Sequence, residues 1–333
     1  MKKIVVGVLV LWLAIWGVQT LQRKSEEKSW TPPLPKEYPL LNEISELNAK
    51  GNEGWLSTLS DTGKLMEITG RQRAALQKEL IRAVQEYPEE PLVISTVALT
   101  AESDIMQVNS YEDLMALIRE RLGPEGESPK DRKAIERHRK HRDEILHQMK
   151  SYLVPIARNV REECEAMACE GPYIKLMLLA QMAYYLQRSG DPEKAEEYLR
   201  LAIDNLDRLE ALEREQVKQE LHTQLGMLYL KQKRYDEAIE ELEASRPERI
   251  TFDILLNGWS DELASGLYEA GYTEAALAYW KDAVAFWEKK LREAKKEKEA
   301  ALIRKRLKGA KELLREIQKE VERGENPQRD TSI

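Results

Sequence analysis

Two histidines have a spacing that could hold a metal ion. His138 and His141 are three residues apart and Glu144 follows three residues later, so a helix would carry the three side chains on one face. Imidazole and carboxylate groups are common ligands of zinc. Four basic residues crowd the same stretch and oppose a cation: Arg137, Arg139, Lys140 and Arg142. Because no cysteine or acidic cluster nearby completes a ligand set, we favour a solvated helix face and predict neither a metal nor a cofactor.

Cys164 and Cys169 are the other reactive side chains. Their spacing of five residues is wrong for a CxxC redox motif or for haem attachment. On an intact helix their Cα atoms would be more than about 7 Å apart, which disfavours a disulfide. Gly171 and Pro172 end that helix directly afterwards, so a disulfide stays open beside the alternative of two buried thiols.

The composition excludes several classes of protein. The chain has 333 residues, of which 42% are hydrophobic and 33% charged, so it can bury a sizeable core. Its net charge of -7 gives no reason to expect nucleic-acid binding. The sequence contains no phosphate-binding loop, nucleophile elbow or zinc-protease motif. We therefore predict no catalytic residues and do not expect an enzyme.

The N-terminus contains a long apolar run. Lys2 and Lys3 precede nineteen uncharged residues, 4–22, and a bilayer core needs roughly 20 residues of helix. A cleaved signal peptide would have small residues at its cleavage site, which Val18-Gln19-Thr20 lacks. We predict an uncleaved transmembrane signal-anchor, with a removed signal peptide as the alternative. The two lysines predict a single-pass protein of the cell membrane with its bulk outside the cytoplasm, in the periplasm.

Helical patterning extends over almost all of the remaining chain. Apolar residues recur at helical spacing and no stretch alternates with a period of two residues, so we predict an all-α fold without a sheet. Separate helices are expected over 91–102 and 111–122. Two more are expected over 130–153 and 156–169, with a break near Pro155.

The predicted domains follow from changes in composition. Four prolines between Pro32 and Pro39 predict an extended linker after the anchor. In chain order the predicted parts are the anchor (1–23), the Pro-rich linker (24–41), degenerate helical repeats with a long helical hairpin (42–169), regular repeats (170–294), a C-terminal helix (295–323) and a disordered tail (324–333).

A repeated pattern of small and large residues is the strongest feature of the sequence. Each unit has a small residue in a first helix, then a tight turn, then two small residues in a second helix. The three sets are Ala183, Leu186, Gly190, Ala195, Leu199 and Ala202; Gly226, Tyr229, Tyr235, Ala238, Leu242 and Ser245; and Ala264, Leu267, Gly271, Ala276, Trp280 and Ala283. The small residues would let neighbouring helices cross closely, while the larger ones fill the gaps beside them.

These sets resemble the tetratricopeptide repeat (TPR), in which a Gly-containing turn joins two antiparallel helices. The resemblance implies a TPR-like α-solenoid of antiparallel helix pairs that binds other proteins. The spacing departs from the family: Ala195 and Ala238 are 43 residues apart and Ala238 and Ala276 are 38 apart, against about 34 in the family. The family's tryptophan early in the first helix is also absent.

In this family the first helices line a concave groove that holds the partner. The resemblance implies seven groove-facing residues: Met177, Tyr184, Gln187, Thr223, Met227, Leu230 and Tyr268. None of them is basic, which argues against capture of a C-terminal carboxylate and for contacts to an extended or helical segment. The alternative is that these side chains only pack against a neighbouring loop or helix.

The C-terminal helix has an apolar seam of its own. Its residues recur at alternating steps of four and three: Ile303, Leu307, Ala310, Leu314, Ile317 and Val321. One interpretation is a capping helix over the last repeat, whose outer face is polar. The other is a coiled coil that pairs two copies of the chain as a homodimer, or one copy with a partner. The chain before it could continue as one long helix or turn within 295–299.

Together these patterns predict a membrane-anchored scaffold for protein–protein interaction. Its role would be that of an assembly factor or chaperone for envelope or membrane proteins, which are its expected partners. The alternative is a non-catalytic structural subunit of a stable membrane complex. A catalytic or metal-dependent role would require an occupied site at His138.

Overall fold

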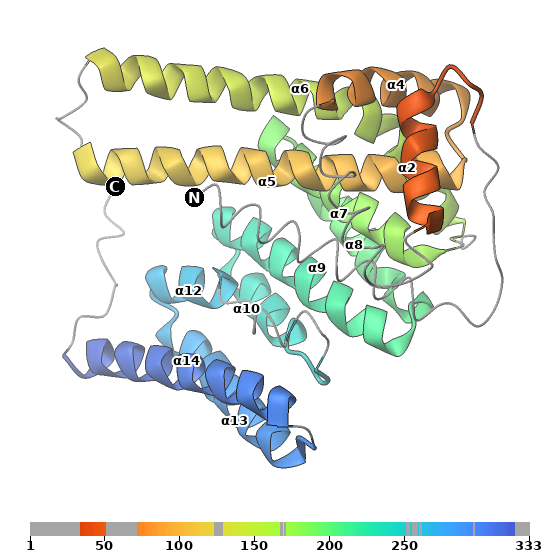
Figure 1. Cartoon of the computed structure of the whole chain (residues 1–333). Coiled ribbons are helices and arrows are strands. Elements are labelled where there is room, and N and C mark those ends of the chain that lie inside the picture. Colours follow the sequence, from red (N-terminus) through yellow and green to blue (C-terminus); the bar gives the residue numbers. More distant parts are fainter. Residues whose placement is uncertain are drawn as a thin grey trace. The chain divides into compact units, whose positions relative to one another are not determined.

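The computed structural model describes residues 34–50, 72–122, 129–166, 171–250, 262–295 and 297–323, with Cys169, Ile254 and Trp259 as single positions. Every regular element in these ranges is helical, as eleven α-helices and one short 3-10 helix, which confirms the predicted all-α class (Figure 1). Within the same ranges, no helix is both long and apolar enough to cross a bilayer. The predicted signal-anchor and the predicted C-terminal tail lie outside the described residues.

The chain divides into two compact units, Met1–Gly190 and Asp191–Ile333. The helices of the first unit are α2 (Pro39–Lys50), α4 (Arg73–Glu86), α5 (Pro91–Leu122), α6 (Pro129–Glu165) and α7 (Pro172–Ser189). Helices α5 and α6 lie side by side along much of their length as a long hairpin (Figure 1). Helix α7 packs against both of them, and α4 packs against α6.

Two breaks predicted from the sequence do not exist. Helix α5 continues through 103–110, and α6 continues through Pro155. Proline removes one backbone hydrogen bond, but Tyr152, Leu153 and Ile156 around it are fully buried. Burial of these side chains offsets the lost hydrogen bond, so tertiary packing decides the length of the helix.

Part of the stretch predicted as a linker, 24–41, is packed against α4. Leu34, Tyr38 and Leu41 are all buried. The Tyr38 hydroxyl donates to Glu86 Oε2 at 2.5 Å, and the guanidinium of Arg82 lies 4.8 Å from the centre of the Tyr38 ring. These contacts attach the end of the proline-rich stretch to α4.

Asp104 is a buried charge at which three helices of the first unit meet. It is fully buried on α5, where its carboxylate forms an ion pair with Arg73 of α4 and accepts a hydrogen bond from the Tyr152 hydroxyl of α6. Gln77 of α4 also donates to it, at 3.5 Å. Burial raises the pKa of the Tyr152 hydroxyl and lowers the pKa of Arg73. The group therefore fixes how α4, α5 and α6 fit together.

The second unit contains a continuous series of packed helices. They are α8 (Pro192–Asp204), the 3-10 helix η1 (Leu206–Arg208), α9 (Ala211–Lys231), α10 (Tyr235–Ala244), α12 (Glu262–Glu269), α13 (Thr273–Glu293) and α14 (Glu297–Glu322). Sequence neighbours pack together: α8 on α9, α9 on α10, α12 on α13 and α13 on α14. Helix α9 also packs on α12, so successive pairs are in contact, as a TPR-like array requires.

The turns of the predicted repeats share an unusual backbone conformation. Gly190 and Gly271 have φ values of 87° and 93°. The middle repeat has Lys233 at this place in its turn, with φ of 61°. A non-glycine residue rarely adopts this left-handed conformation, so the turn geometry of the repeat is kept even where glycine is missing.

The small residues of the repeats are buried, as their proposed role in close helix packing requires. Each of the following is at most 1% exposed: Ala183, Ala195, Ala202, Ala238, Ser245, Ala264, Ala276 and Ala283. Gly226 of α9 is the tightest position. A Cβ atom built there would lie 2.2 Å from Leu263 Cδ2 of α12 and 3.1 Å from Glu241 Cβ of α10. Both neighbouring helices therefore approach α9 where it has no side chain.

We predict that Gly226→Ala destabilises the protein by about 1–3 kcal/mol, because the added methyl group would overlap Leu263. Gly309→Ala in α14 is the matched control, since a Cβ there has no atom within 4 Å. An alanine in an open helix position should stabilise by about 0.5–1 kcal/mol. Urea unfolding measures both changes, and a neutral or stabilising Gly226→Ala would contradict the close packing.

We predict that Asp104→Ala lowers the free energy of unfolding by about 3–5 kcal/mol, because it leaves the half-buried Arg73 without its counter-charge and the buried Tyr152 hydroxyl without its acceptor. Asp143→Ala is the control. Asp143 forms an exposed ion pair with Arg142 on α6, and its removal should change stability by no more than about 0.5 kcal/mol. Equal losses for the two variants would show that the buried group does not stabilise the first unit.

Candidate protein-binding surface

The predicted groove residues on α9 partly pack against α12. Thr223 is 7% exposed, whereas Met227 and Leu230 are half-buried. A Cβ atom built at Gly266 of α12 would lie 2.4 Å from Leu230 Cδ2 and 3.9 Å from Met227 Sδ. Leu230 and Met227 therefore fill the space beside this glycine, and only part of each remains for a partner.

Tyr268 of α12 is in contact with the C-terminal helix. Its hydroxyl donates to Glu320 Oε2 of α14 at 2.6 Å. The chain turns between α13 and α14, and α14 folds back along α13. Lys311 and Glu288 join the two helices with an ion pair at 2.6 Å. Ile303 and Ile317 of the apolar seam are buried, as expected for a helix that covers the last pair.

The three predicted groove residues on α7 belong to the first unit. Met177 is 6% exposed, and Tyr184 and Gln187 are half-buried. The Tyr184 hydroxyl donates to Asn109 Oδ1 of α5 at 2.6 Å, and the Arg188 guanidinium lies 4.8 Å from its ring centre. Burial raises the pKa of Tyr184 to about 12. This face of α7 thus makes specific contacts with α5.

An accessible stripe of α9 shares Met227 with the predicted positions, and its members Gln224 and Lys231 follow Thr223 and Leu230 by one residue. Glu220 and Lys231 are exposed, and Gln224 and Met227 between them are half-buried. Their spacing of four, three and four residues places them on one face of the helix. We call these four residues the α9 stripe, in which Met227 is the one apolar member. Of the positions that the repeat register predicts, Thr223 is buried and Leu230 packs beside Gly266 of α12.

A network of charged side chains holds the base of the α9–α10 pair to α8. Glu196 of α8 accepts hydrogen bonds from Arg234 at 2.6 Å and from the Tyr229 hydroxyl at 3.0 Å. Arg200 donates a third hydrogen bond to Glu196, at 2.9 Å. The guanidinium carbon of Arg234 lies 4.1 Å from the centre of the Tyr229 ring. Burial alone would raise the pKa of the Glu196 carboxyl, but the three donors together lower it below its ordinary value. No sequence pattern predicts this network, because Tyr229 and Arg234 join it from outside α8.

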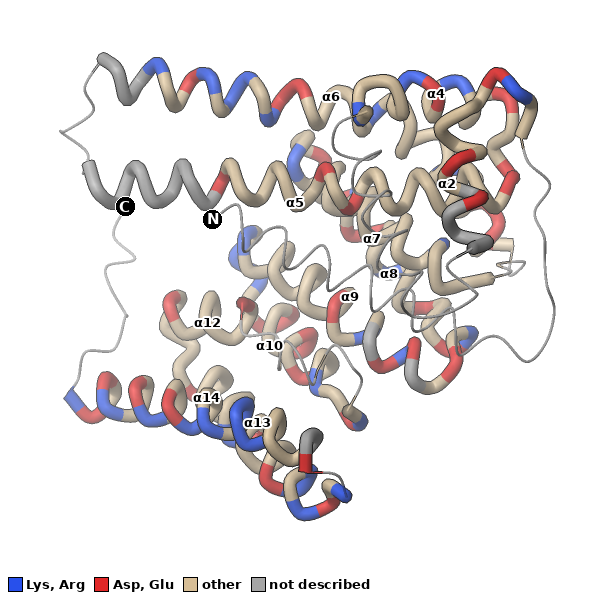
Figure 2. The backbone as a smooth tube through the Cα atoms, in the orientation of Figure 1, with Lys and Arg blue, Asp and Glu red and all other residues tan. Residues whose placement is uncertain are grey.

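The histidines considered as metal ligands pack against an aromatic ring. The rings of His138 and His141 lie 5.5 and 5.2 Å from that of Tyr111 on α5. His141 Nδ1 is 3.4 Å from Glu144 Oε2. Basic residues surround the histidines on α6, with acidic residues on either side of them (Figure 2). In the described part of the chain, no group of three His, Cys, Asp or Glu side chains is arranged to hold a metal ion.

Comparison with known families identifies tetratricopeptide repeats in this chain. The family model for the tetratricopeptide repeat matches residues 178–205 and 219–245. These segments include all residues of the first two predicted sets of small and large residues, while the third set lies beyond the match. Neither the curated proteins nor the solved structures include a significant match to the chain. The repeats suggest a role in protein–protein interaction and thus protein partners in general.

We predict that Glu196→Gln lowers stability at neutral pH and that the loss shrinks in acid. The pKa of the Glu196 carboxyl is lower in the folded protein than in the unfolded chain, where it is about 4.3. The ionised carboxylate therefore adds its full share to the free energy of unfolding above this unfolded pKa. That share is lost as the pH falls through the folded pKa. Urea unfolding from pH 7 to pH 3 should show the two proteins converging below about pH 4.3. A constant difference over this range would contradict the role of the ionised carboxylate.

Proposed function

We propose that this chain is a non-catalytic scaffold that binds a partner polypeptide through the α9 stripe and the face of α12 beside Met227, at Gly266. The observation that supports it most is the pair of tetratricopeptide repeats, whose second match, 219–245, contains the stripe. The helices around the stripe are fixed by close packing at Gly226 and by the Glu196 network. A rigid surface limits the entropy that binding costs.

Met227 is the side chain on which we centre the binding surface. It is half-buried and lies next to polar residues of the stripe, with its sulfur near Gly266. A flexible thioether adapts to different apolar partners, and polar neighbours can fix the register of a bound segment. The preferred partner is thus a segment that presents an apolar side chain flanked by polar groups.

The proposed setting is the outer face of the cell membrane, in the periplasm. It is supported by the sequence alone, through the uncharged run at 4–22 behind two lysines. There the scaffold would act as an assembly factor or chaperone for envelope or membrane proteins. The alternative, a permanent subunit of a membrane complex, differs in the lifetime and the stoichiometry of the bound partner.

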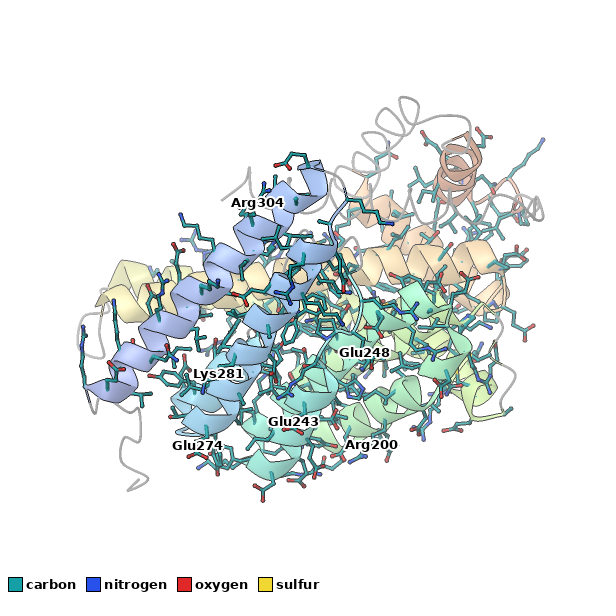
Figure 3. All side chains as sticks on the ribbon, turned by 90° about the horizontal axis from the view of Figure 1, so that it is seen from below. Arg200, Glu243, Glu248, Glu274, Lys281 and Arg304 are labelled. Atoms are coloured by element: carbon teal, nitrogen blue, oxygen red, sulfur yellow. The ribbon has the colours of Figure 1, made fainter. Side chains whose placement is uncertain are left out.

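We predict that a photo-crosslinker in place of Met227 captures specific partners in intact membranes. The same crosslinker in place of Glu243 is the matched control, because Glu243 is exposed on a different helix, α10 (Figure 3). Partner adducts should form at 227 and not at 243. Identical adducts at both positions, or none at 227, would contradict a partner site on the stripe.

A Met227→Gln variant then tests affinity once a partner is identified. Loss of the central apolar contact should weaken binding by about tenfold or more, with little effect on melting temperature. A bound partner that exchanges with newly made partner in a pulse–chase experiment, before crosslinking, supports the chaperone role. A partner that stays bound at fixed stoichiometry supports the structural subunit.

A further inference from the structure

The two cysteines meet at the junction of α6 and α7. Cys164 lies in the last turn of α6, which ends at Glu165, and Cys169 comes after the helix. They are 2% and 6% exposed. Because Cys169 is not part of the helix, the distance argument that disfavours a disulfide on an intact helix does not apply.

The two thiols are in direct contact. The thiol groups of Cys164 and Cys169 form a hydrogen bond with each other. This contact, together with burial, raises the pKa of the Cys164 thiol. Native Cys164 is therefore protonated at neutral pH and reacts slowly, since the thiolate is the nucleophile.

The surrounding chain holds this contact from both sides. Glu163 of α6 and Lys175 of α7 form an ion pair across the junction. Gly171 has φ of 58°, a left-handed conformation that suits glycine, and Pro172 then begins α7. The ion pair thus joins the last turn of α6 to the first turn of α7, the two helices between which Cys169 lies in the sequence.

We propose that Cys164 and Cys169 are a disulfide-forming site that covalently closes the α6–α7 junction. The oxidant is a disulfide, either glutathione disulfide or a protein disulfide. One cysteine thiolate attacks a sulfur of the oxidant, which forms a mixed disulfide and releases one thiol. The second cysteine thiolate attacks the mixed disulfide and releases the other thiol. The two cysteines lose two electrons and two protons, and the oxidant becomes two thiols.

The buried position decides when this bond forms. In the folded protein both sulfurs are shielded from an oxidant, so exchange is slow. During folding the thiols are accessible, and the packing of α6 and α7 then brings them together. The bond should therefore appear when the chain folds in an oxidising buffer. This site does not depend on the proposed function, because both cysteines belong to the first compact unit and the α9 stripe belongs to the second.

The test refolds the reduced full chain, in mild detergent, in a glutathione redox buffer. Cysteines are then alkylated under denaturing conditions and the intact mass is measured. The expected main product is monomeric, carries no alkyl group and is lighter than the reduced chain by two hydrogen atoms. A product with both cysteines alkylated, with glutathione attached, or linked to a second chain would overturn the proposal.

A second measurement compares melting temperatures, with Cys169→Ala as the control. The oxidised wild type should melt at a higher temperature than the reduced wild type, because the bond restricts the unfolded chain. The variant should melt at one temperature in both buffers. An oxidised wild type that melts no higher than the reduced form would show that the folded junction does not accommodate the bond, which also overturns the proposal.

Discussion

The second unit depends on the absence of side-chain volume where its helices cross. At Gly226, a Cβ atom would lie 2.2 Å from Leu263 Cδ2 of α12, closer than Cβ atoms come to other atoms, and 3.1 Å from Glu241 Cβ of α10, which is a tight contact. Alanine or serine occupies the other crossing positions of the repeats, and each is buried. Small residues at such positions let ridges and grooves of adjacent helices fit, so each pair is held by its neighbours. The exposed stripe of α9 exists because the other faces of that helix are covered.

The local part of this architecture could be predicted from sequence, because small residues and tight turns recur along the chain. The all-α class, the turns at Gly190 and Gly271 and the buried alanines all follow from this pattern. The lengths of α5 and α6 could not be predicted in the same way. Asp104 indicates a helix end by its intrinsic preference, but in the structure it is the centre of a buried ion-pair group.

The structure shows which of the predicted groove residues remain accessible and which are covered by other helices. Repeat register predicts which helices could line a binding surface, and Met227 lies on the accessible stripe. The repeat register does not show how closely α12 approaches α9. The contact between these two helices, at Gly266, buries part of Leu230. Tyr184 and Tyr268 likewise bond to α5 and α14, which come from distant parts of the chain. Such long-range contacts have no sequence periodicity by which they could be found.

A double-mutant cycle between Gly226 and Leu263 tests the central claim, that close helix packing at small residues holds the array together. If Leu263 Cδ2 is what a Cβ at position 226 would meet, the cost of Gly226→Ala should largely disappear in a Leu263→Ala background. The expected interaction energy is about 1 kcal/mol or more. Strictly additive effects of the two substitutions on the free energy of unfolding would contradict the account.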